Sequence, residues 1–177
     1  MVKKLFLVSM IALTGFAFNC NQIEAKNSDG DIVTINKDSD KAPDFALKSV
    51  DGKIVKLSDY KGKIIIIDFW ATWCPPCRRG IPDLVELQKE YKKDLVVIGI
   101  SLDAAKTIKD VPGFIKEYGI NYPIVYGDQQ VTIDYGGIRS IPTSFVIDQK
   151  GNVVDSNVGL VSKDTFVNKI KELLKKK

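Results

Sequence analysis

An apolar run that ends in two closely spaced cysteines constrains this chain more than any other feature. Residues 63–69 read Lys-Ile-Ile-Ile-Ile-Asp-Phe, and residues 70–77 continue Trp-Ala-Thr-Trp-Cys-Pro-Pro-Cys. The isoleucines predict a strand that is covered on both faces, and the apolar spacing after Cys77 predicts a helix. The sequence therefore places a Cys-x-x-Cys dithiol where a buried strand gives way to a helix, which is the position of a redox site.

This position favours the ionised form of one thiol. A helix N-terminus offers unpaired N–H groups and the positive end of the helix dipole, and both stabilise a thiolate. We expect Cys74 to be the exposed, attacking thiolate, with a pKa below the ordinary value of about 8.5. Cys77, one turn further on, is expected to be more buried and to resolve the mixed disulfide. Pro75 suits an early helix position, and Pro76 stiffens the loop and holds the sulfurs close.

Two other interpretations of the Cys-x-x-Cys are weak. A structural zinc site needs four Cys or His ligands, whereas the chain has three cysteines, one of them Cys20, and no histidine. A purely structural disulfide across so short a loop would constrain the unfolded chain very little. The lack of histidine also removes Ser-His-Asp and Cys-His nucleophiles and His-based metal catalysis. We expect no metal site.

The N-terminus reads as an export signal. Lys3 and Lys4 precede an apolar run of 14 residues at 5–18, which is short for a membrane span but suits a signal peptide. Cys20 follows at once and suggests a lipoprotein signal in which Cys20 is lipidated. An uncleaved N-terminal anchor and ordinary cleavage near Ala25 remain open alternatives. All three place the folded domain outside the cytoplasm, in the periplasm or cell envelope. There a Cys-x-x-Cys is expected to take part in thiol-disulfide exchange with other proteins.

Charge gives no reason to expect a nucleic-acid partner. The formal net charge is +4, and residues 20–177 carry 24 basic against 22 acidic side chains once Lys3 and Lys4 are set aside. A nucleic-acid-binding domain would be far more basic.

The pattern divides the chain into a leader at 1–19, a flexible polar tether at 20–41 and one folded domain at 42–177. After the first hairpin and the central strand with its helix, the pattern predicts a strand, a helix, a strand, a helix, a hairpin and a last helix. The predicted elements are a hairpin of 45–50 and 54–57, strands at 95–101, 122–126, 144–148 and 152–158, and helices at 106–118, 128–135 and after Ser162. This alternation implies an α/β fold, a central mixed sheet with helices on both faces.

Four segments make the chain resemble the extracytoplasmic thioredoxin-like proteins of the TlpA/ResA/CcmG group, in the AhpC/TSA–thioredoxin superfamily. They are Ala-Pro-Asp-Phe at 42–45, Leu-Ser-Asp-Tyr-Lys-Gly-Lys at 57–63, Trp-Cys-Pro-Pro-Cys-Arg at 73–78 and Ile-Arg-Ser-Ile-Pro-Thr at 138–143. The resemblance covers roughly residues 42–175. It implies a thioredoxin fold with an N-terminal β-hairpin and a central insertion at 103–127.

The resemblance also implies roles for residues around the dithiol. Pro142 matches the cis-proline that lies against the dithiol in this fold, and the backbone of Ile141 would pair with an extended substrate segment. Trp73 could shield the disulfide and offer a surface to partners. An ordinary trans proline in a turn is the alternative for Pro142.

Asp68 stands six residues before Cys74, where thioredoxins carry a buried acid. Burial beneath Cys77 would raise its pKa and let it take the proton of that thiol. A strand-end aspartate that makes hydrogen bonds is the alternative. Some ResA-like proteins have a glutamate three residues after the second cysteine, but this chain has Gly80 there, so Asp68 is the better candidate for the acid.

The resemblance implies reduction of protein disulfides by a Cys74–Cys77 dithiol that needs no other cofactor. A periplasmic protein disulfide, with apocytochrome c as the leading candidate, would be the substrate, and a membrane electron donor of the CcdA/DsbD kind would restore the dithiol. Two alternatives remain. A thiol peroxidase would need Thr or Ser where the chain has Ala71, and a dithiol Cu(I)-binding module would bind metal without redox turnover.

Overall fold

The computed structural model describes residues 41–175. The predicted leader, tether and lipidation at Cys20 lie outside these residues, so the domain boundaries stay predictions. Between residues 41 and 175, no helix is both long and apolar enough to cross a membrane.

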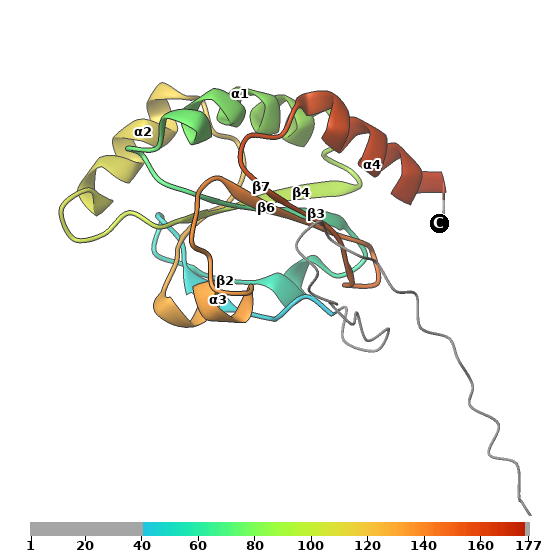
Figure 1. The fold of residues 1–177 in the computed structure, drawn as a ribbon, viewed down its shortest axis with the longest axis horizontal. Helices are drawn as coiled ribbons and strands as arrows, with labels where there is room; N and C mark the ends of the chain where they lie inside the picture. The colour runs from blue at the N-terminus through green and yellow to red at the C-terminus, as the bar shows by residue number, and fades with distance from the viewer. Residues whose placement is uncertain (1–40, 176–177) are drawn as a thin grey trace, which may run out of the picture. The chain divides into compact units, whose positions relative to one another are not determined.

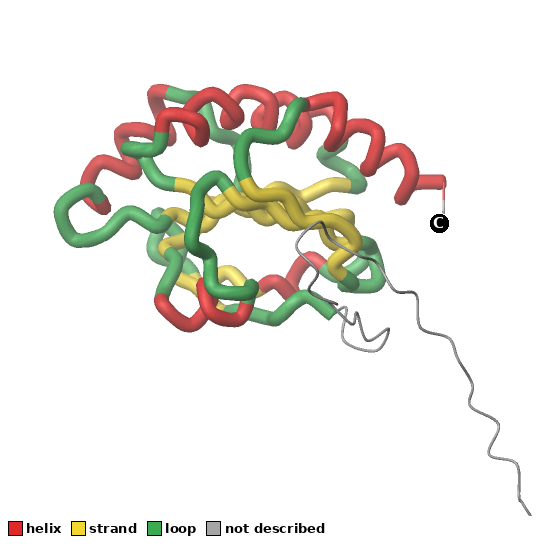
Figure 2. The backbone as a smooth tube through the Cα atoms, in the orientation of Figure 1, coloured by secondary structure: helices red, strands yellow, loops and turns green. Residues whose placement is uncertain are grey.

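A mixed five-stranded sheet forms the middle layer of the described domain, between two layers of helices and loops (Figure 2). In spatial order its strands are β5 (Ile124–Tyr126), β4 (Leu95–Ser101), β3 (Ile64–Trp70), β6 (Thr143–Ile147) and β7 (Val153–Val158). β3 runs parallel to β4 and antiparallel to β6, so the dithiol-bearing strand lies in the centre. All seven residues of β3 are buried, as the isoleucine run predicts.

Both faces of the sheet are covered, which confirms the predicted α/β layering (Figure 1). The first face carries α1 (Pro75–Glu90), α2 (Val111–Glu117) and α4 (Lys163–Lys175). The second carries α3 (Gln129–Asp134), the antiparallel hairpin of β1 (Ala46–Lys48) and β2 (Ile54–Lys56), and the 3-10 helix η1 (Leu57–Tyr60). Successive β3 residues alternate between two apolar cores, with Ile66 in the first and Ile67 in the second.

The predicted elements are present, with shifts at their ends. The helix predicted at 106–118 splits into η2 (Ile108–Asp110) and α2, because Pro112 lies at the start of α2, the helix position that tolerates proline best. The N–H of Thr165 donates to Ser162 Oγ at 3.3 Å, which confirms Ser162 as the N-cap of α4. β5 is two residues shorter than predicted.

The insertion at 103–127 adds β5 to the edge of the sheet and places α2 beside α1. An aromatic stack packs the insertion against β3, the strand that precedes the dithiol. Ring centroids are 5.1 Å apart for Trp70 and Phe114, and 4.1 Å apart for Phe114 and Tyr118. The Arg78 guanidinium of α1 donates to Tyr118 Oη at 2.8 Å and lies 5.7 Å from the centre of its ring. The insertion therefore braces both the strand and the helix that flank the dithiol.

We expect Phe114→Ala to lower the free energy of unfolding by about 3–5 kcal/mol, because it removes the buried centre of this stack. Tyr118→Phe is the matched control, since it removes only the hydroxyl and is expected to cost below about 1 kcal/mol. Urea unfolding of the oxidised variants measures both effects. Equal unfolding midpoints for Phe114→Ala and the wild type would show that α2 does not brace this region.

Candidate active site

The two cysteines of the Cys-x-x-Cys are joined at the start of α1. Cys74 and Cys77 form a disulfide with an S–S distance of 2.09 Å and a Cα–Cα distance of 5.3 Å. Cys74 is the N-cap of α1, and its Sγ accepts a hydrogen bond from the N–H of Cys77 at 3.3 Å. Pro75 and Pro76 fill the first helical positions, where no N–H partner is needed. The sulfur of Cys74 thus meets a helix N–H donor, as a thiolate-stabilising site requires.

The prediction that Cys74 is the exposed member of the pair is wrong for the oxidised protein. Each cysteine is only 2% exposed. The loop before β6 lies against Cys74, and Cys74 Sγ is 3.7 Å from the carbonyl oxygen of Ile141. The two sulfurs therefore differ in their neighbours rather than in exposure, since Cys74 meets this loop and Cys77 lines a small cavity.

The loop against Cys74 contains the cis peptide that the resemblance implied, between Ile141 and Pro142. Thr143 Oγ1 donates to the Ser140 carbonyl at 2.7 Å, and the N–H of Gly159 donates to the Pro142 carbonyl at 2.8 Å. Pro142 is buried and Ile141 half-buried. These bonds hold the backbone of residue 141 next to the disulfide.

Asp68 lies on β3 and is 7% exposed. Burial raises the pKa of its carboxyl group to about 7. Asp68 and Cys77 line the same small cavity, of about 20 Å³, which places the acid within reach of the second thiol. Among residues 41–175 no hydrogen bond to its carboxyl group is found, and burial is the only cause of its raised pKa. The alternative of a strand-end aspartate held by hydrogen bonds therefore has no support in the described domain.

The aromatic residues near the dithiol divide into core and surface. Trp70 and Phe69 are 1% and 0% exposed, and each belongs to one of the two apolar cores. Trp73 is 58% exposed, on the loop that joins β3 to α1. It is the one of the three that can meet another protein.

Sequence reasoning missed the anchor of that loop. The backbone N–H and Oγ1 of Thr72 donate to the Asp103 carboxylate at 2.9 and 2.6 Å, and Ser101 Oγ donates to it at 3.0 Å. Asp103 is 7% exposed and stands just after β4. It ties the segment before Cys74 to the neighbouring strand, and no local pattern marks it because it lies 31 residues from Thr72.

Gly80, on α1, lies close to the side chain of Leu160. A Cβ atom at this position would lie 2.9 Å from Leu160 Cδ1, on the loop after β7. A glutamate here would have to displace Leu160, because such an approach is too close for carbon atoms. The departure from the ResA-like pattern therefore goes with close packing of α1 against this loop.

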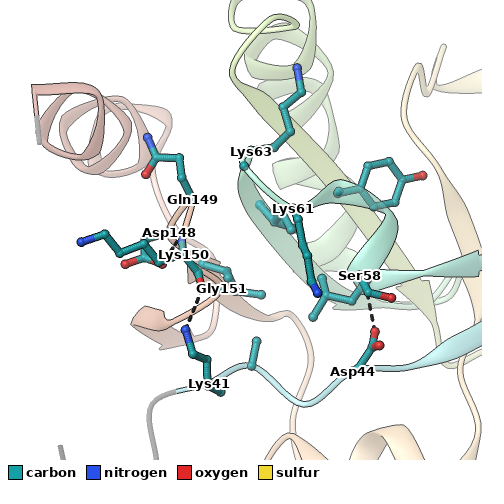
Figure 3. A pocket seen from close by; sticks show the side chains of 15 residues that line it. Lys41, Asp44, Ser58, Lys61, Lys63, Asp148, Gln149, Lys150 and Gly151 are labelled. Atoms are coloured by element: carbon teal, nitrogen blue, oxygen red, sulfur yellow. Dashed lines mark hydrogen bonds between the residues drawn. The ribbon is translucent and has the colours of Figure 1, made fainter. Parts of the chain in front are cut away.

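A larger cavity, of about 410 Å³, lies at the other end of β3 (Figure 3). Lys41 Nζ donates to the Lys150 carbonyl at 2.7 Å, and the N–H of Ser58 donates to the Asp44 carboxylate at 3.1 Å. Lys63, also in its lining, precedes β3, whereas the dithiol follows that strand. This cavity is thus remote from the disulfide, and no cysteine lines it.

The mixed sheet, with helices on both faces, forms a thioredoxin fold. Its disulfide at the start of α1 and the cis-proline loop against that disulfide define a thiol-disulfide oxidoreductase. The chain belongs to the AhpC/TSA family, whose sequence profile matches residues 39–156. It is 34% identical over 175 residues to the thioredoxin-like protein YneN of Bacillus subtilis (strain 168), covering 96% of this chain and 98% of that protein. It is 33% identical over 171 residues to the thiol-disulfide oxidoreductase ResA of Bacillus thuringiensis (strain Al Hakam), covering 97% and 96%.

Solved structures agree with this assignment. A thiol:disulfide interchange protein of the thioredoxin family from Chlorobium tepidum TLS aligns with a TM-score of 0.69 and 39% identity, covering 76% of this chain and 95% of that one. The exposed lipoprotein thioredoxin Etrx1 of Streptococcus pneumoniae strain TIGR4 aligns with a TM-score of 0.65 and 36% identity, covering 74% and 100%. The resemblance inferred from the four sequence segments is confirmed.

Proposed function

We propose that this protein reduces disulfide bonds in extracytoplasmic proteins through the Cys74–Cys77 dithiol. The observation that carries the proposal is the position of Cys74 Sγ, between a helix N–H donor and the loop that holds the Ile141 carbonyl. The helix N–H donor stabilises a thiolate. The backbone of the loop at Ile141 lies where the backbone of an extended substrate can pair.

Reduction proceeds in two exchanges. The Cys74 thiolate attacks one sulfur of the substrate disulfide, and the other substrate sulfur leaves as a thiolate. Cys77 then loses its proton and attacks Cys74 Sγ, which releases the second substrate sulfur and leaves the protein oxidised. Two electrons pass from the dithiol to the substrate, and no further cofactor is needed.

Asp68 is suited to take the Cys77 proton. A carboxylate with a pKa of about 7 is partly ionised at neutral pH and is basic enough to accept a proton from a thiol. The small cavity shared by Asp68 and Cys77 has room for one bridging water molecule. Proton transfer through that water would generate the resolving thiolate only when it is needed.

Trp73 and the backbone of Ile141 form the proposed docking surface. The indole is exposed beside the disulfide, and the carbonyl of Ile141 lies against Cys74. A substrate segment that adds to this backbone as a strand would bring its cystine to Cys74 and pack a side chain on Trp73.

We also propose that the domain is exported and held at the membrane by lipidation of Cys20, with residues 20–41 as a flexible tether. A membrane electron donor of the CcdA/DsbD kind would restore the dithiol, and apocytochrome c is the proposed substrate. The naming of one structural neighbour as an exposed lipoprotein thioredoxin supports the anchoring part. The relatives named ResA and YneN support the exchange chemistry.

A Cys77→Ala trap tests the proposal. In cells that produce the full chain, this variant is expected to accumulate a mixed disulfide through Cys74, because the resolving thiol is missing. Mass spectrometry of the trapped complex identifies the partner, and Cys74→Ala/Cys77→Ala is the control. A lack of any trapped protein, together with no insulin reduction by the wild type, would contradict exchange. Peroxide consumption or Cu(I) titration of the reduced protein would then distinguish the two alternatives.

A further inference from the structure

A row of three polar side chains crosses the sheet beneath the dithiol. Asp68 on β3 is the cross-strand partner of Ser144 on β6, and Ser144 is the partner of Asn157 on β7. Direct partners of adjacent strands point to the same face, with Cβ atoms about 4.5–5.5 Å apart. The three side chains therefore lie side by side on one face of the sheet.

Two members of this row have unused polar atoms. Within residues 41–175, Ser144 Oγ and Asn157 Nδ2 are both buried without a hydrogen-bond partner. Ser144 is 3% exposed. A buried polar atom without a partner is destabilising, so such atoms usually mark a bound water or a functional demand.

Ser144 lines the same cavity as Asp68 and Cys77. The cavity, of about 20 Å³, is large enough for one water molecule, and a water in such a site makes two to four hydrogen bonds. Its polar lining supplies them from the carboxyl group of Asp68, the hydroxyl of Ser144 and the thiol of Cys77. The rest of the lining is apolar and includes Leu84 and Phe166.

Among the described residues Ser144 Oγ has no hydrogen-bond partner, so its single hydroxyl proton is free to point at the cavity. A water there accepts from Ser144 and from the Cys77 thiol and donates to the Asp68 carboxylate.

We propose that Ser144 is a positioning residue for proton transfer: its hydroxyl orients the cavity water that carries the Cys77 proton to Asp68. The inference rests on the proposed function, in which Asp68 is the base for Cys77. In the transfer, the thiol gives its proton to the water as the water gives one to the carboxylate. The products are a Cys77 thiolate, a neutral Asp68 and the same water.

The other groups around Asp68 do not disturb its titration. Its β4 partner is Gly99, and α4 contributes the apolar Phe166 to the cavity. Tyr122, before β5, interacts with the Asp68 charge, but burial raises the pKa of this tyrosine well above its ordinary value. Cys77 of α1 does not titrate in the oxidised protein. The Asp68 signal of the oxidised protein therefore reports one ionisation.

Ser144→Ala in the oxidised full-length protein tests the inference. The measurement is carboxyl-carbon NMR of ¹³C-labelled aspartate across a pH series. We expect the Asp68 titration midpoint to rise by about one pH unit, a tenfold change in ionisation, because the carboxylate loses an oriented water. Ser144→Thr keeps the hydroxyl and is expected to restore the wild-type midpoint.

Ser156→Ala is the matched control, because Ser156 is an exposed serine next to Asn157 on β7. In the reduced protein, Ser144→Ala should also slow the resolution of a preformed mixed disulfide about tenfold at neutral pH. An Asp68 midpoint that is the same in Ser144→Ala and the wild type would overturn the inference. Exchange by the wild type alongside such a result would leave the proposed function standing, whereas a wild type that shows no exchange would refute the function, and with it the proton-transfer role, even if the midpoint shifted.

Discussion

Cys74→Ala is expected to lower the rate of protein-disulfide reduction at least about a thousandfold, because alanine cannot form the mixed disulfide. Cys77 cannot replace it, since this sulfur lines the small cavity with Asp68, whereas Cys74 contacts the carbonyl of Ile141. Insulin reduction, followed with dithiothreitol as electron donor, measures the loss.

Cys77→Ala provides the contrast. This variant should also fail to turn over, yet it should form one mixed disulfide with insulin per molecule, because the attacking thiol remains. Both variants remove the disulfide, so a difference between them cannot come from lost stability. A Cys74→Ala protein that kept a rate within tenfold of the wild type would show that Cys77, and not Cys74, makes the first attack.

Asp68→Asn is expected to change how stability depends on pH. The ordinary pKa of an aspartate is 3.8, and burial raises that of Asp68 in the folded protein to about 7. Between these values the folded state keeps a proton that the unfolded state has released, so stability falls as pH rises, by about 1.4 kcal/mol per pH unit. The total loss is about 4 kcal/mol, it is complete above about pH 7, and it is absent below about pH 4.

Asparagine cannot ionise, so Asp68→Asn removes this loss. The variant and the wild type should have similar stability near pH 4, and the variant should be more stable by up to about 4 kcal/mol near pH 8. Urea unfolding of both oxidised proteins at several pH values measures the difference. Parallel stability curves across this range would show that Asp68 is ionised throughout in the folded protein.

The sequence was most informative where structure depends on neighbouring residues. The isoleucine run predicted a central strand covered on both faces, because its side chains alternate between the two cores. The Cys-x-x-Cys predicted a sulfur at a helix N-terminus, and the N–H of Cys77 does donate to Cys74 Sγ. Both features lie within one strand and one helical turn.

Features that join distant segments could not be predicted. The burial of Cys74 depends on the carbonyl of Ile141, 67 residues further on. The bond from Arg78 to Tyr118 spans 40 residues. Ser144 looked like an ordinary strand residue, because its place beside Asp68 is set by the pairing of β3 with β6. In each case the register of the sheet or the closure of a loop decides the neighbour.

The most direct test of the account is the rate at which iodoacetamide labels Cys74 in the reduced protein, followed by mass spectrometry as a function of pH. The helix N–H groups around Cys74 predict a thiolate well below the ordinary thiol pKa of about 8.5, so labelling near about pH 6 should be much faster than that of a small free thiol. Denatured protein is the control, because unfolding removes the helix and should remove the difference. Labelling of folded Cys74 no faster than the small thiol would contradict the account.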